Sequence, residues 1–134
     1  DNDMVVLLVS DPQAVKSLSA LVVPIGSLED PDSHPGLAHY LEHMTLMGSK
    51  NYPQPDNLAE FLKMHGGSHN ASTAPYRTAF YLEVENDALQ GAVDRLADFT
   101  QSIHSTKGQP HPAICCTGLF LLIHRIMKPC QLVR

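Results

Sequence analysis

The chain has 134 residues, 43% of them hydrophobic, and a formal net charge of −5. This length suits one domain or less around a single core, and the negative charge argues against a nucleic-acid partner. No stretch reaches the roughly 18–20 apolar residues that cross a bilayer, so no membrane segment is predicted.

Two strands are predicted at the start of the chain. Met4–Val9 is a continuous β-branched and leucine run that stops at Ser10-Asp11-Pro12, a pattern typical of a buried strand. Ser17–Ile25 is a second run of the same kind. The turn between them predicts an antiparallel pair.

Helical spacing begins near Pro35. Ser33 or His34 is the expected cap, Pro35 suits a first turn, and Gly48 is the expected stop. Apolar residues recur through this segment at Leu37, Leu41, Met44 and Met47. The segment therefore predicts an amphipathic helix.

The middle of the chain predicts a second helix, more strand and a third helix. Asn57 and Glu60 resemble a capping box, and Gly66-Gly67 ends that helix. Ser68–Glu85 is strand-like, and Asp87 is the expected cap of the last helix. We therefore expect an α+β fold: an antiparallel sheet with helices packed on one side.

Composition changes sharply after Asp98. Residues 1–98 hold every acidic residue, whereas residues 99–134 hold none, four Lys or Arg, and all three cysteines. The odd cysteine count and spacing predict neither a disulfide framework nor a zinc knuckle. Such a shift can mark a domain boundary or a basic arm. We favour a non-native tail, out of frame or fused, which sequencing the coding DNA across codon 99 would test.

The run His39-Tyr40-Leu41-Glu42-His43 carries the chemistry. Residues three and four apart share one face of a helix, so His39 and His43 stack one turn apart with Glu42 beside them. Two imidazoles so placed can bind one zinc ion. A carboxylate beside the metal can take a proton from the attacking water and pass it to the leaving amine. The alternative is an ordinary amphipathic helix that carries two histidines.

Two motifs in this order resemble a known family. Gly36–Met44 with Met47-Gly48-Ser49 is similar to the inverted zinc motif H-x-x-E-H of the pitrilysin-type (inverzincin) metallopeptidases, relatives of insulysin. Gly66–Thr73 with Thr78–Tyr81 is similar to the second signature of that family. The resemblance covers about residues 4–98, which we interpret as the N-terminal part of a pitrilysin-type peptidase domain.

The resemblance implies a zinc endopeptidase that cuts peptides and small proteins inside a closed chamber. His39 and His43 would bind Zn²⁺, and Glu42 would be the general base. Asn70, Ala71 and Ser72 would lie on an edge strand that pairs with the substrate backbone. His65 and His69 are expected to be loop or strand histidines rather than ligands. The implied compartment is the periplasm, although no signal peptide opens the chain, which begins with Asp1 and is expected to be processed or truncated.

The resemblance fails at the third zinc ligand. The family supplies a glutamate about 75 residues beyond the motif, which falls near Phe120, and no Asp or Glu follows Asp98. Cys115, Cys116 or His124 could replace it only by accident. The remainder of the peptidase is also missing. Two other readings therefore stay open: a non-catalytic peptide-binding or structural relative, and an inactive truncated product.

Overall fold

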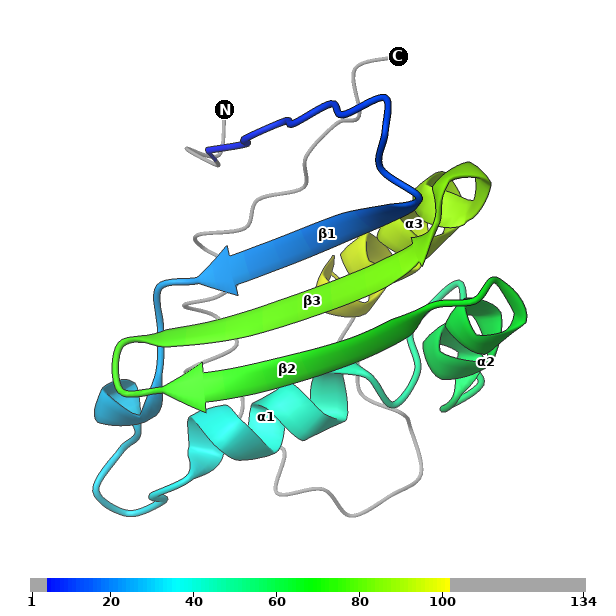
Figure 1. The fold of residues 1–134 in the computed structure, drawn as a ribbon. Helices are drawn as coiled ribbons and strands as arrows, with labels where there is room; N and C mark the ends of the chain where they lie inside the picture. Colours follow the sequence, from blue (N-terminus) through cyan, green and yellow to red (C-terminus); the bar gives the residue numbers. More distant parts are fainter. Residues whose placement is uncertain (1–4, 102–134) are drawn as a thin grey trace.

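The computed structural model describes residues 5–101, which form one three-stranded sheet with helices on one face (Figure 1). This arrangement confirms the predicted α+β class. No helix in this range is long and apolar enough to cross a membrane. The elements in chain order are β1 (Lys16–Val23), η1 (Ser27–Glu29), α1 (Leu37–Thr45), α2 (Asn57–Met64), β2 (Ser68–Ala74), β3 (Arg77–Glu85), η2 (Asn86–Ala88) and α3 (Leu89–Gln101).

The sheet has the order β1-β3-β2 and is antiparallel throughout. The strand-like stretch Ser68–Glu85 divides into β2 and β3, because Pro75 and Tyr76 form a tight turn between the paired residues Ala74 and Arg77. β3 is therefore the central strand, and β2 lies at an edge beside α1 (Figure 1).

Alternation along β3 directs one row of side chains into the core. Thr78, Phe80, Leu82 and Val84 are buried, whereas Arg77, Tyr81 and Glu85 are exposed. This is the period of two expected for a sheet covered on one face. Helices α2 and α3 supply the opposing side of the core with Leu58, Leu62, Ala92, Leu96 and Phe99. Burying each large apolar side chain contributes about 1.5–3 kcal/mol.

The first predicted strand is wrong. Residues 5–10 form no strand, and their side chains are exposed, with Val5 at 95% and Leu8 at 88%. An apolar run indicates a tendency to be buried, but a strand also needs a partner for its backbone. A turn in which Ala14 N–H donates to the Asp11 carbonyl (3.1 Å) separates this segment from β1. The second predicted strand, Ser17–Ile25, is confirmed as β1.

The predicted cap of α1 is also wrong. The helix begins at Leu37 after Gly36, whose φ of 88° lies in the left-handed region that favours glycine. The Asp30 carboxylate accepts hydrogen bonds from the backbone amides of Gly36 (2.7 Å) and Ala38 (2.8 Å). An acidic residue six positions upstream thus performs the capping that we expected from Ser33 or His34.

Helix α2 begins at Asn57, with Asp56 as its N-cap residue. It lacks the capping box predicted from Asn57 and Glu60. The Asn57 side chain instead accepts a hydrogen bond from Arg95 Nε at 2.8 Å, which ties α2 to α3. The predicted end at Gly66-Gly67 is confirmed: Gly66 has φ 62°, and the Gly67 amide donates to the Leu62 carbonyl at 2.7 Å.

Asp30→Ala should lower the free energy of unfolding by about 1–2 kcal/mol, because two amides at the start of α1 lose their acceptor. Urea unfolding followed by circular dichroism measures this loss. Asp32→Ala is the matched control, since Asp32 is exposed and the same charge is removed nearby. Equal stability of the two variants would contradict the assigned cap.

Candidate active site

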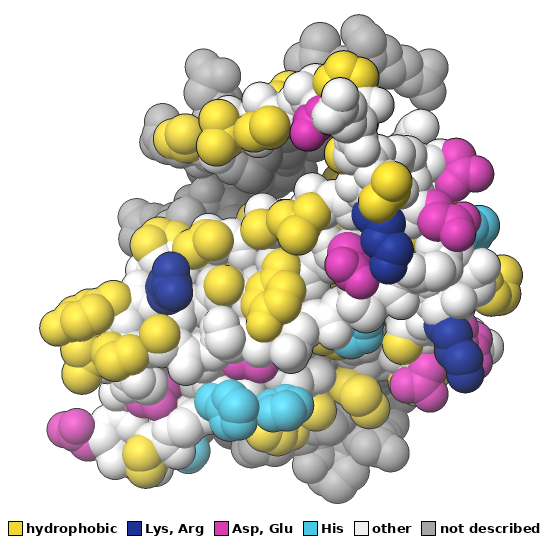
Figure 2. Space-filling model, viewed as in Figure 1, with side chains coloured by type: hydrophobic (Ala, Val, Ile, Leu, Met, Phe, Trp, Pro, Cys, Tyr) yellow, Lys and Arg dark blue, Asp and Glu magenta, His cyan; other side chains and the backbone are white. Residues whose placement is uncertain are grey.

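The orientation of α1 about its own axis divides its side chains into a buried group and an exposed group. Leu37, Leu41 and Thr45 are buried against the rest of the domain, whereas His39 and His43 are exposed. The spacing of three and four residues places the two histidines one turn apart on the solvent side. Histidine side chains accordingly appear at the surface over α1 in Figure 2.

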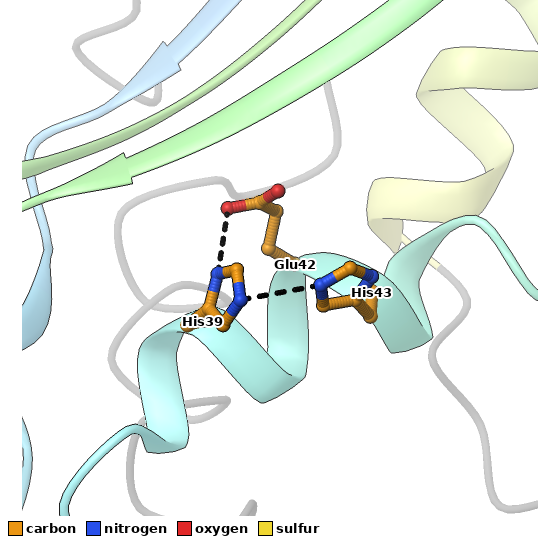
Figure 3. Close-up of side chains that lie close together, drawn as sticks. All are labelled: His39, Glu42 and His43. Carbon is orange, nitrogen blue, oxygen red and sulfur yellow. Dashed lines mark hydrogen bonds and ion pairs between the residues drawn. The ribbon is translucent and has the colours of Figure 1, made fainter.

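The two imidazoles and the Glu42 carboxylate converge at one point (Figure 3). His39 Nε2 and His43 Nε2 are 3.3 Å apart, and the two rings meet edge to face. His39 Nδ1 lies 3.5 Å from Glu42 Oε2. One nitrogen or oxygen atom from each residue lies within 4.8 Å of the others. Sequence spacing predicted this juxtaposition, and the structure brings the three residues together.

The spacing of the two Nε2 atoms suits a shared metal ion. Two nitrogens bound at about 2.0–2.1 Å to a tetrahedral zinc are separated by about 3.3–3.4 Å. The 3.3 Å observed between the histidines falls in that range. The carboxylate faces His39 Nδ1, and such a partner favours the tautomer whose Nε2 lone pair is available to a metal. These residues therefore fit the first two positions of a zinc site.

Glu42 is a buried carboxyl residue, and β2 supplies its hydrogen bond. The residue is 7% exposed. Thr73 Oγ1 in β2 donates a short hydrogen bond to Glu42 Oε2, the same oxygen that faces His39. Among the described residues, no hydrogen bond or ion pair reaches Oε1. One carboxylate oxygen is thus anchored, and the other remains able to accept a proton.

A cleft of about 280 Å³ lies beside this group. Glu42 and His43 form part of its wall, together with Asn70 and Ala71 of β2. The rest of the lining combines apolar and polar side chains: Leu46, Met47, Pro55, Asp56, Leu58, Ala59 and His69. Ser72, the third predicted substrate contact, is exposed on β2 but does not line the cleft.

The backbone amide of Ala71 in β2 points toward the unpaired edge of the sheet. Ala71 N–H donates to Asn70 Oδ1 at 2.9 Å. That amide is therefore directed away from β3, since an amide in the ladder would bond to the neighbouring strand. Within residues 5–101, β3 is the one strand that pairs with β2. Its outer backbone groups can thus pair with another extended chain.

The two histidines that we expected to be loop or strand residues lie outside the cluster of His39, Glu42 and His43. His65 ends α2 and packs on Phe61, with ring centroids 4.5 Å apart. His69 lies in β2, and its buried Nδ1 has no hydrogen-bond partner among residues 5–101. Desolvation by burial lowers the pKa of His69 below its ordinary value of 6.5.

Three residues that support the site escaped prediction. Thr73 binds Glu42, Asp30 caps α1, and Asp98 of α3 fastens the loop that follows α1. Asp98 accepts hydrogen bonds from Ser49 Oγ at 2.5 Å and from the Asn51 amide at 2.9 Å. Period-two alternation in β2 could have placed Thr73 on the inner face, but its contact with α1 depends on tertiary packing.

The residues considered for a third ligand, Cys115, Cys116 and His124, lie outside residues 5–101, as does the position near Phe120 where the family's glutamate would fall. Within that range, the grouping able to hold a metal consists of His39, Glu42 and His43. The described part of the chain therefore supplies two imidazoles that could hold a metal and one neighbouring carboxylate.

Comparison with known sequences shows the family. The insulinase family (peptidase family M16) matches residues 5–107, and the chain belongs to this family. It is 89% identical over 98 residues to Protease 3 of Salmonella typhimurium, and 88% identical to Protease 3 of Escherichia coli. Insulin-degrading enzyme of Mus musculus is 48% identical over the same length. Each of these alignments covers 73% of this chain and 10% of the relative.

Solved structures show the same fold. The crystal structure of pitrilysin matches with a TM-score of 0.74 and 84% identity, over 76% of this chain and 11% of that protein. A protease from Helicobacter pylori matches with a TM-score of 0.65 and 22% identity, over 70% of this chain and 22% of that protein. The second match supports the fold alone.

The His69 imidazole should titrate below pH 6.5 in the folded chain, and its proton resonances in an NMR pH series measure the midpoint. A lowered pKa means that the unfolded chain binds more protons, so the free energy of unfolding should fall as the pH drops through 6.5. His69→Gln should flatten this dependence, and His65→Gln is the control. A midpoint at or above 6.5 would contradict burial of the ring.

Proposed function

We propose that this chain is the N-terminal part of the catalytic unit of a zinc-dependent metalloendopeptidase. The separation of 3.3 Å between His39 Nε2 and His43 Nε2 carries the proposal, because it suits two ligands of one zinc ion. Family membership supports the same class of reaction, hydrolysis of peptide bonds. The chain spans about a tenth of the length of the relatives that it matches, so the complete activity is assigned to the longer protein.

Each residue of the cluster has a separate role in this proposal. His39 and His43 hold Zn²⁺ through their Nε2 atoms. Glu42 takes a proton from the attacking water through its carboxylate and then donates it to the leaving amine. Bound zinc supplies a Lewis acid and lowers the pKa of a water toward about 7. Burial of Glu42 excludes bulk water from the carboxylate that performs both transfers.

The proposed substrates are peptides and small proteins. An extended substrate would pair with the edge of β2 at Asn70, Ala71 and Ser72, close to Glu42 and His43 in the cleft wall. Main-chain pairing recognises an extended backbone and depends little on side chains. The names Protease 3 and insulin-degrading enzyme, which the relatives carry, agree with polypeptide substrates. No nucleic-acid or membrane partner is proposed.

Domain organisation and compartment complete the proposal. Residues 1–98 are assigned to the peptidase domain, and residues 99–134 to the atypical tail, out of frame or otherwise non-native. Helix α3 continues to Gln101, and residues 102–134 lie outside the described range. Similarity to the bacterial Protease 3 sequences supports the periplasm as the compartment of the longer protein.

A second candidate is a chain that binds peptides without cutting them, or that has no activity of its own. The observation that favours it is the absence of Asp and Glu after Asp98 in the sequence, which leaves the zinc site without the family's third ligand, a glutamate. A two-histidine site should bind zinc far more weakly than one with three protein ligands. Metal affinity and cleavage therefore distinguish the two candidates.

Calorimetric titration with zinc should show one ion bound per chain, and His43→Ala should weaken binding by at least about 100-fold because one of two imidazole ligands is lost. His34→Ala is the matched control, since it removes a histidine from the loop before α1. Equal weakening in both variants would contradict the site at His39 and His43, whereas weak or absent binding by the unmodified chain would favour the second candidate.

Glu42→Gln should lower chelator-sensitive peptide cleavage by about 10²–10⁴-fold, because the amide cannot accept the proton of the attacking water. Zinc affinity should stay within about threefold of the unmodified chain, since Glu42 is not a ligand in this proposal. Glu60→Gln, an exposed position on α2, is the control. Peptide binding without any chelator-sensitive cleavage by the unmodified chain would favour the second candidate.

A further inference from the structure

Thr73 links the edge strand to the residue proposed as the general base. Its hydroxyl donates to Glu42 Oε2 across the interface between β2 and α1. We propose that Thr73 is a positioning residue, which holds the Glu42 carboxylate beside the metal position and keeps it from becoming a metal ligand. This inference rests on the proposed zinc site and adds a residue that the H-x-x-E-H spacing does not contain.

Glu42 needs such a restraint because it can reach the metal position. Its carboxylate already lies within 4.8 Å of the nitrogen atoms of His39 and His43, and its side chain has three rotatable bonds. A carboxylate that near two imidazoles can become a third ligand by rotating about these bonds. A carboxylate bound to the metal would no longer be available to accept a proton.

The anchored oxygen shows which rotation is prevented. The Thr73 hydroxyl and His39 Nδ1 both meet Oε2, from the strand and from the preceding helical turn respectively. Two contacts from separate elements restrain the position of Oε2, and loss of one of them would leave the carboxylate freer to turn. Hydrogen bonds to a charged acceptor are stronger than those between neutral groups, so this contact favours one rotamer of Glu42.

Thr73 is itself held firmly. It pairs with Thr78 in the central strand, and Thr78 Oγ1 donates to the Ile25 carbonyl at 2.9 Å. The branched Cβ of threonine restricts its first side-chain torsion, which limits the directions open to the hydroxyl. The donor therefore belongs to the sheet and does not move with α1, which is what positioning requires.

The test compares Thr73→Val, which keeps the branched shape without the hydroxyl, with Thr73→Ser, which keeps the hydroxyl. In the metal-free chain, ¹³C relaxation gives the order parameter of the Glu42 side chain. We expect about 0.8 for the unmodified chain and Thr73→Ser, and below about 0.6 for Thr73→Val. An unchanged order parameter in folded Thr73→Val would overturn the proposal. If that variant does not fold, Thr73→Ala replaces it.

Cobalt(II) titration then reports on the metal. Thr73→Val should bind Co²⁺ at least about tenfold more tightly and change its visible spectrum, because the released carboxylate becomes a ligand. The double variant Thr73→Val with Glu42→Gln should lose both effects. A merely structural tie between α1 and β2 would leave affinity and spectrum unchanged, and that result would overturn the proposal. Absence of Co²⁺ binding by the unmodified chain contradicts the zinc site instead, and the metal-free order parameter still decides on Thr73.

Discussion

The orientation of the site depends on how α1 is turned about its axis. Leu37, Leu41 and Thr45 must face the core, and this requirement also buries Glu42 on the flank of the helix. Helical spacing then places His39 and His43 on the solvent side, and no additional contact is needed to expose them. The apolar face of one short helix thus determines which residues can meet a metal and which residue is shielded from water.

Local spacing explains why the cluster could be predicted from the sequence. His39, Glu42 and His43 belong to one helix, so their distances depend on helical geometry and very little on the rest of the fold. The same holds for the alternating residues of β3 and the glycines that end α2. These features require only a neighbouring turn or a neighbouring strand.

Features that depend on distant partners could not be predicted. Thr73 reaches Glu42 across 31 positions of the chain, and Asp98 reaches Ser49 across 49. Asp30 caps α1 from six positions before Gly36, although Ser33 and His34 lie closer to the helix in the sequence. The strand predicted before β1 failed for a related reason. The apolar composition of that segment indicates a preference for burial, but it does not show whether a neighbouring strand is available for pairing.

The order of strands in the sheet also sets an order of assembly. β2 and β3 are joined by a tight turn, so their pairing costs little chain entropy, whereas β1 meets β3 through contacts such as Lys16 with Glu83, 67 positions apart. The hairpin is therefore favoured to form first, with β1 adding last. During synthesis on the ribosome, β1 emerges long before β3, its strand partner in the described part of the chain. Its leucine and valine side chains then depend on chaperones, or on rapid completion of β3, to stay out of aggregates.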